Sequence, residues 1–150
     1  MLRSAWLTFA VGLMIALAAC SGEAPLAAGE QRVILPGGRT IRAEVLTRPE
    51  DMQRGMMFRN SLAPDRGMLF VHGAPGRYAY WMFQCLIPLD IIWMDVNRKI
   101  VEISADTPPC HGEASTCPNY GGHQDSLYVL ELAGGMARRY GLKLGDTIGF

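Results

Sequence analysis

Short segments in which apolar and polar side chains alternate follow one another along most of the chain, and this period of two predicts β-strands. The alternation is clearest over residues 40–46, so one face of that strand should be buried and the other should face water. Pro-Gly-Gly at residues 36–38 separates it from a strand at 31–35. This arrangement is typical of a hairpin, because glycine tolerates the positive φ angles of a tight turn.

The same pattern predicts further strands, each bounded by turn-forming residues. They lie at residues 67–71, 78–82, 89–95, 99–104, 127–132 and 147–150. Two short helices are expected at residues 48–57 and 134–140, and Thr47 and Glu50 resemble a capping box for the first. Many strands with close turns and few helices predict an α+β, mainly β domain. We expect a small curled antiparallel sheet or a barrel-like arrangement with two short helices.

The N-terminal segment differs in composition from the rest. Residues 5–19 are apolar and follow Arg3; they are too short for a typical membrane span and suit the apolar region of a secretory signal. Residues 17–20, Leu-Ala-Ala-Cys, resemble the bacterial lipobox, in which the Cys thiol receives diacylglycerol before cleavage. We therefore expect a lipoprotein signal peptide over residues 1–19 and a lipid bilayer anchor at Cys20. The alternative is an ordinary signal peptide followed by an incidental cysteine.

Residues 20–30 are small, polar and rich in alanine, and we interpret them as a tether that leaves residues 31–150 as one domain. Ser21 follows the predicted lipidation site, in place of the aspartate that tends to retain enterobacterial lipoproteins at the inner membrane. The expected location is therefore the periplasmic face of the envelope, with the outer membrane favoured.

The charge balance argues against a nucleic-acid partner. The chain has 14 basic and 14 acidic residues, and removing residues 1–19, which contain Arg3 and no acid, leaves 13 against 14. Phosphate binding needs clustered Lys and Arg, and the densest basic pair, Arg138 and Arg139, is better explained as the end of a helix. Neither a nucleic-acid partner nor a cofactor is predicted.

Six segments share their order and spacing with one protein family. They are GMMFR (55–59), GMLFVH (67–72), YWM (80–82), IPLDIIWMD (87–95), VLEL (129–132) and GLKLGD (141–146). Over about residues 33–150 the chain resembles DUF192, a bacterial and archaeal family of undefined function whose members are often exported. The resemblance implies a compact β-rich fold and no particular mechanism. At residues 83–85 the chain departs from the family, with Phe-Gln-Cys in place of the usual Lys-Asn-Thr.

Asp90 is the first candidate for a functional role. It lies between Leu89 and Ile91 in a strand that is apolar on both faces, where an isolated carboxylate is costly. One interpretation is structural: Asp90 accepts backbone N–H groups or an arginine and locks a loop. In the other, Asp90 serves ligand binding or acid–base chemistry and faces one pocket together with Arg59.

The residues expected to bind a ligand are Arg59, Trp81, Gln84, Asp90 and Tyr120. Aromatic faces stack on the C–H surfaces of sugars, so Trp81 and Trp93, with Tyr78 and Tyr80, suggest a platform for a small or glycan-like ligand. Filling of the core is the competing explanation for these aromatic residues.

The cysteines after the tether predict one disulfide and one free thiol. Cys110 and Cys117 would close a short loop in an oxidising compartment, which favours a disulfide. The alternative is zinc bound by these cysteines with His111 and His123, but close ligand pairs are missing and no metal site is predicted. Cys85 remains as the free thiol.

Three functions remain open. The leading hypothesis is an envelope lipoprotein of unknown function whose domain binds a small or glycan-like ligand. The first alternative is a hydrolase-type enzyme that uses Asp90 or Cys85. The second is a periplasmic copper-handling protein, since thiol and thioether sulfur bind Cu(I). The methionines considered for it are Met52, Met56, Met57, Met68, Met82 and Met94, for which core packing is the competing explanation.

Overall fold

The computed structural model describes residues 25–150. The predicted signal peptide and the lipidation site Cys20 lie outside the described residues. Between residues 25 and 150, no helix combines the length and the apolar character needed to cross a bilayer. The fold is mostly β with two short helices, which confirms the predicted class.

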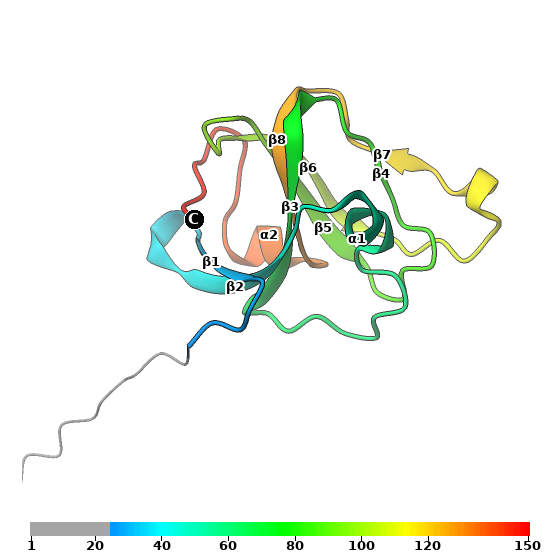
Figure 1. Ribbon diagram of the computed structural model, residues 1–150, viewed down its shortest axis with the longest axis horizontal. Coiled ribbons are helices and arrows are strands. Elements are labelled where there is room, and N and C mark those ends of the chain that lie inside the picture. The colour runs from blue at the N-terminus through cyan, green and yellow to red at the C-terminus, as the bar shows by residue number, and fades with distance from the viewer. Residues whose placement is uncertain (1–24) are drawn as a thin grey trace, which may run out of the picture.

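One six-stranded sheet forms the frame of the molecule (Figure 1). Its strands, in spatial order, are β1 (Glu30–Ile34), β2 (Thr40–Leu46), β3 (Arg66–Gly76), β8 (Ser126–Ala133), β5 (Leu89–Met94) and β6 (Ile100–Thr107). A separate ribbon pairs β4 (Tyr80–Trp81) with β7 (Asn119–Tyr120). The helices are α1 (Pro49–Arg54) and α2 (Met136–Arg139), and short 3₁₀ turns occupy Pro36–Gly38 and Ala114–Thr116.

The sheet is mixed and open, whereas the sequence predicted antiparallel pairing and allowed a barrel. β2 and β3 are parallel, because residues 47–65 cross over through α1 and return the chain in the same direction. The outer strands β1 and β6 are not hydrogen-bonded to each other, so the sheet does not close. Alternation of apolar residues does not distinguish the two pairing directions, and this is why the sequence prediction was wrong here.

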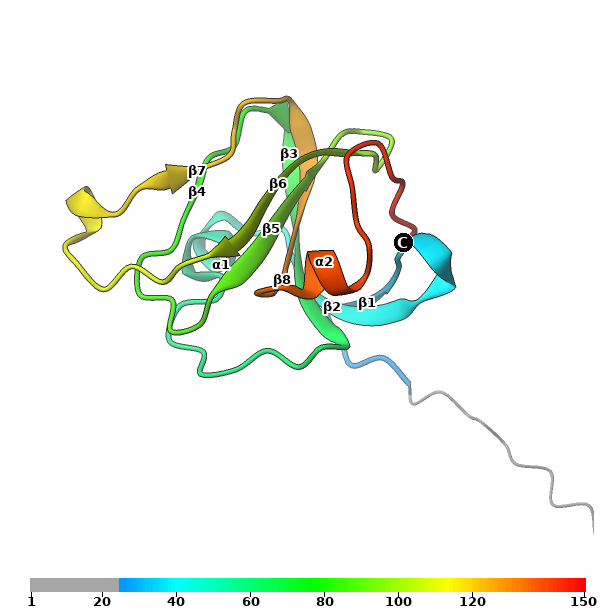
Figure 2. The same cartoon turned by 180° about the vertical axis from the view of Figure 1, so that it is seen from behind.

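Different elements cover the two faces of the sheet. On one face, α2 and the C-terminal segment enclose a cluster that includes Ile41, Ile92 and Leu130. On the other, α1 and the β4–β7 ribbon enclose a cluster that includes Phe70 and Trp93. Figures 1 and 2 show α1 and the ribbon on one side of the β3–β8 pair, and α2 with β1 and β2 on the other. Every residue of β5 is therefore buried, and a polar side chain there needs an internal partner.

Asp90 in β5 finds its partners on the α2 face. Its Oδ1 accepts the backbone N–H groups of Asp106 (2.7 Å) and Gly135 (3.1 Å), and its Oδ2 accepts that of Ala137 (2.6 Å). Gly135 and Ala137 lie at the start of α2, so one buried carboxylate joins β5, the end of β6 and this helix. The structural interpretation of Asp90 is thus confirmed.

Two predicted details at element ends are wrong. Thr47 does not cap α1, whose N-cap residue is Arg48 and which has no side-chain cap. Residues 147–150 form isolated bridges to Lys99 and Ile34, and no strand. In both places the backbone finds other hydrogen-bond partners, so the local sequence pattern did not decide the structure.

A disulfide between Cys110 and Cys117 staples the long segment between β6 and β8, as predicted. After β7 the segment passes directly over the Trp93 ring. A Cβ atom at Gly121 would lie 2.3 Å from this ring, and the φ angle of 65° at Gly121 also favours glycine. The segment therefore seals Trp93 inside the molecule.

Asp90→Asn should destabilise the fold by on the order of 2–4 kcal/mol, because the introduced amide NH₂ group faces a backbone N–H that loses its acceptor. The free energy of unfolding measured in urea tests this. Asp125→Asn is the matched control, since Asp125 is exposed and only loosely paired with Arg77, at 3.7 Å. Equal stability of the two variants would contradict the assigned role of Asp90.

Candidate functional site

A second buried acid, Glu131 in β8, lies on the opposite face of the sheet from Asp90. Its register partners are Met68 in β3 and Ile91 in β5, which place it under α1. Only 4% of Glu131 is exposed, and its Oε2 has no hydrogen-bond partner among residues 25–150. Burial raises the pKa of Glu131 to about 8, although the positive charge of Arg59 opposes this effect. Glu131 is therefore mainly protonated at neutral pH.

Glu131 borders a small cavity of about 30 Å³ beneath α1. Its lining includes Cys85 and Tyr80, two further groups that titrate. Burial, reinforced by the charge of Glu131, raises the pKa of the Cys85 thiol to about 12 and also raises the pKa of Tyr80. A nucleophilic cysteine needs a thiolate, so this environment does not activate Cys85.

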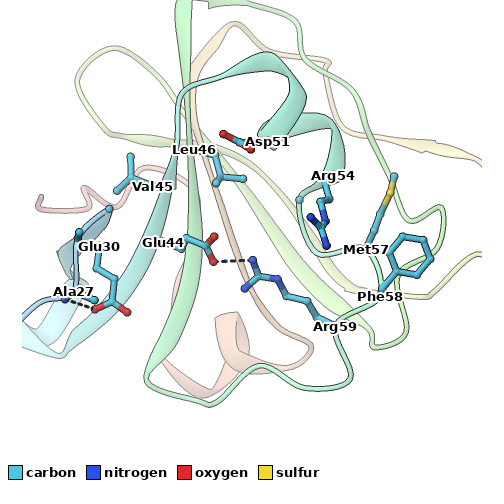
Figure 3. Close-up of a pocket in the computed structure, with 13 residues that line it drawn as sticks. Ala27, Glu30, Glu44, Val45, Leu46, Asp51, Arg54, Met57, Phe58 and Arg59 are labelled. Atoms are coloured by element: carbon cyan, nitrogen blue, oxygen red, sulfur yellow. Dashed lines mark hydrogen bonds and ion pairs between the residues drawn. The ribbon is translucent and has the colours of Figure 1, made fainter.

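A larger hollow of about 640 Å³ opens beside α1. One wall is the segment 27–30, which leads into β1, and the floor is the end of β2 at residues 44–46. The opposite wall is α1 and the loop after it, with side chains of Asp51, Arg54 and Arg59 (Figure 3). The last part of the predicted tether is thus packed against the domain, where Gly29 accepts the N–H of Val45 at 2.8 Å.

Each acidic side chain that lines this hollow is neutralised by an arginine. Glu44 pairs with Arg59 at 2.8 Å, as Figure 3 shows, Asp51 pairs with Arg48 at 3.3 Å, and Glu30 pairs with Arg66. Strand pairing sets Glu30 directly opposite Glu44, and like charges in that position need such compensation.

Arg54, at the end of α1, also lines the hollow, and no acidic side chain within residues 25–150 forms an ion pair with it. With the acids already paired, Arg54 contributes a positive charge that has no local counter-charge. The hollow therefore suits an anion.

An apolar ledge continues the hollow on the other side of Arg54. Trp81 and Phe83 border a shallow depression of about 290 Å³, and their ring centroids are 5.2 Å apart. Arg54 and Met57 line the hollow, the depression and the small cavity alike. The three spaces therefore adjoin one another around the C-terminal end of α1.

The structure brings together only part of the predicted site. Arg59 lines the large hollow and Trp81 lines the adjoining ledge. Asp90 lies on the other face of the sheet, where all its hydrogen bonds go to backbone N–H groups, and Arg59 pairs with Glu44 instead. The hypothesis that Asp90 and Arg59 face one pocket is wrong.

Gln84 and Tyr120 have structural positions. The backbone of Gln84 accepts the N–H of Phe58 and donates to the carbonyl of Cys110, which ties the loop after α1 to the disulfide segment. Tyr120 pairs with Tyr80 across the β4–β7 ribbon and packs against the core. Trp93 is completely buried, so it fills the core and forms no platform. The disulfide also removes the zinc alternative.

Two residues at the observed site were missed from the sequence. Glu131 lies between Leu130 and Leu132, and an acid between two apolar residues of a strand indicated burial at Asp90 as well. Only the position of β8 inside the sheet shows that both faces of this strand are covered. The sequence around Arg54 does not mark it as a site residue, because the positions of acids in distant strands decide whether Arg54 has an ion-pair partner.

Comparison with known proteins agrees with the sequence resemblance. Residues 32–150 match DUF192, which is described as Uncharacterized ACR. The chain belongs to the DUF192 family. No curated protein matches this DUF192 chain.

Two crystal structures are similar to this DUF192 protein. One is a protein of unknown function from Novosphingobium aromaticivorans DSM 12444, with 32% identity, a TM-score of 0.69, and coverage of 79% of this chain and 82% of that chain. The other is a proposed transcription regulator from Sinorhizobium meliloti 1021, with 32% identity, a TM-score of 0.70, and coverage of 85% and 97%.

Glu131 should make the stability of the protein depend on pH. Its pKa is raised from 4.5 to about 8 on folding, so the folded state holds the proton more tightly than the unfolded state. The contribution of Glu131 to the free energy of unfolding is complete below about pH 4.5. It is lost as pH rises to 8, by about 1.4 kcal/mol per pH unit. Glu131→Gln should remove this slope from the unfolding free energy, while Glu113→Gln, at an exposed site, should retain it. Parallel curves for wild type and Glu131→Gln would contradict the assignment.

Proposed function

We propose that this DUF192 protein is an envelope-anchored lipoprotein that binds a small anionic ligand of glycan type in the hollow beside Arg54. The observation that carries the proposal is the charge pattern of the hollow: its acids are paired with arginines, and Arg54 forms no ion pair with any acid in residues 25–150. A guanidinium group offers two parallel N–H donors that match a carboxylate or a phosphate.

The ledge beside Arg54 supports a ligand with a flat or C–H-rich part. Trp81 and Phe83 are half-buried, so their rings keep accessible surface next to the cation. Aromatic faces of this kind stack on sugar rings, and a nearby charge fixes the orientation of the ligand. The volumes of the hollow and the ledge, about 640 and 290 Å³, suit one or two sugar units.

The anchor would keep this site near a membrane. Residues 27–29 form a wall of the hollow, and the seven residue steps from Cys20 to Ala27 span at most about 25 Å when extended. A lipid at Cys20 would therefore hold the hollow close to the bilayer surface. Components of the cell wall next to that surface are the ligands we favour.

The other readings have less support. Both oxygens of Asp90 are engaged by backbone groups, and the thiol of Cys85 is buried and protonated, so neither supplies a base or nucleophile for hydrolysis. The name of the Sinorhizobium relative suggests DNA binding. Here six of the thirteen basic side chains within residues 25–150 form ion pairs with acids: Arg48, Arg59, Arg66, Arg77, Arg138 and Lys143. The adjacent pair Arg138 and Arg139 lies in the last turn of α2, where Arg138 pairs with Asp106, so this pair gives little support to that role.

N-acetylmuramic acid and N-acetylglucosamine share a ring and differ in a lactyl group that carries a carboxylate, which makes them matched probes. Calorimetric titration of the full chain in detergent should give tighter binding of the acid by at least about tenfold, the effect of one charge-assisted contact. Arg54→Gln should abolish this difference, and Trp81→Leu should weaken both sugars. Arg138→Gln, on the opposite face, is the control and should change neither.

Two results would overturn the proposal. One is failure of both sugars to bind the folded wild-type chain. The other is an advantage of the acid that survives in Arg54→Gln, which would assign the anion to a different cation.

The anchor is tested separately at Cys20. Mass spectrometry of the protein from bacterial membranes should find cleavage before Cys20 and diacylglycerol on its sulfur, and Cys20→Ser should release the chain from the membrane fraction. An unmodified Cys20 in membrane-bound protein would refute lipidation and leave the ligand proposal untouched.

A further inference from the structure

The small cavity beneath α1 is rich in sulfur. Its lining residues include Met52, Met56, Met57 and Cys85, together with Glu131. We propose that this cavity binds one Cu(I) ion through thioether and thiol sulfur, with the Glu131 carboxylate as the counter-charge. The proposal is independent of the anionic ligand in the outer hollow.

The sulfur-containing residues come from separate segments of the chain. Met52 lies in α1 and Met56 lies just after the helix ends, and both pack into the core cluster on this face of the sheet. Cys85 lies in a turn where its N–H donates to the carbonyl of Met82 at 3.2 Å. Because the donors come from separate segments that the fold brings together, their convergence is a property of the tertiary structure.

The environment of Glu131 is a second, independent observation, and it indicates that a hydrogen-bond donor or a cation is missing. Its Oε2 is buried without a hydrogen bond from any residue in 25–150, and it lies at the same cavity as the sulfur atoms. Buried carboxyl oxygens in folded proteins are almost always satisfied by a donor or a cation. A cation in the cavity would supply what Glu131 lacks.

Charge and donor type select the ion. Thioethers and thiols are soft donors that favour Cu(I), whereas magnesium and calcium prefer oxygen donors. The Glu131 carboxylate would offset the charge of one Cu(I) ion, and Arg54, which also lines the cavity, disfavours an ion of higher charge there. Within residues 25–150 no cluster of three His, Cys, Asp or Glu side chains offers a conventional metal site. The methionines are therefore essential to this site.

The size of the cavity and its surroundings agree with a single ion. A volume of about 30 Å³ is close to that of one water molecule, too small for an organic ligand. Met57 and Trp81 separate the cavity from the outer spaces, and Met57 has a flexible unbranched side chain. Rotation of Met57 provides an entry path without unfolding of α1.

The test is anaerobic titration of the full chain with Cu(I) against the chromophoric chelator bicinchoninate. Wild type should retain one equivalent, and Cys85→Ser, Met56→Leu and Glu131→Gln should each lower the affinity by at least about tenfold, the effect of one lost ligand contact of about 1.4 kcal/mol. Met94→Leu is the matched control, because Met94 is equally buried but lies in the cluster on the other face. Cys20 is present in all the variants, so differences among them do not arise from it.

X-ray absorption at the copper edge should show sulfur neighbours in wild type. Thermal unfolding of each metal-free variant establishes that it is folded; Met56→Leu keeps the volume of the side chain, so it tests the site even if another variant unfolds. Loss of Cu(I) from wild type and Met56→Leu at the same chelator concentration would overturn the proposal. Tighter retention of Zn(II) than of Cu(I) by wild type would do so as well.

Discussion

The structure depends on one constraint: the adjacent inner strands β5 and β8 are covered on both faces, so every polar group in them must be satisfied inside the protein. Two acidic residues occupy these strands and meet the constraint differently. Asp90 points toward α2 and receives three backbone N–H groups. Glu131 points toward α1 and has an oxygen with no partner among the described residues. Asp90 therefore stabilises the fold, whereas Glu131 keeps a buried oxygen without a hydrogen-bond partner among residues 25–150.

This difference distinguishes the two faces of the sheet. The α2 face is closed by apolar packing and by the Asp90 hydrogen bonds, which fix the start of the helix. The α1 face holds the buried cavity, the large hollow and the aromatic ledge. The parallel pairing of β2 and β3 requires a crossover on this face, and the end of that crossover helix places Arg54 where all three spaces meet.

The proposed anion site and the proposed Cu(I) site use opposite chemistry in adjoining places. The outer site is polar and open to solvent. Its positive charge comes from Arg54, because the acids that line the hollow are paired with other arginines. The inner site is apolar, and its character comes from sulfur and a carboxyl group that burial keeps mainly protonated at neutral pH. Arg59 couples the two, since it pairs with Glu44 outside and lowers the pKa of Glu131 inside.

The sequence by itself determined the elements that depend on neighbouring residues. Alternating side chains, Pro-Gly-Gly and the spacing of Cys110 and Cys117 were enough for the hairpin, the main strands, the β-rich class and the disulfide. The buried position of Asp90 also followed, because an acid between apolar residues of a strand must find partners. These properties arise from backbone sterics and short-range patterns.

Only the tertiary structure decided the pairing direction of β2 and β3, the partner of Arg59, the isolation of Arg54 and the cavity around Glu131. Each of these depends on which side chains from distant segments meet across the sheet. A charge is paired or free, and a polar atom satisfied or not, according to its neighbours in space. Long-range packing sets those neighbours, and local sequence does not.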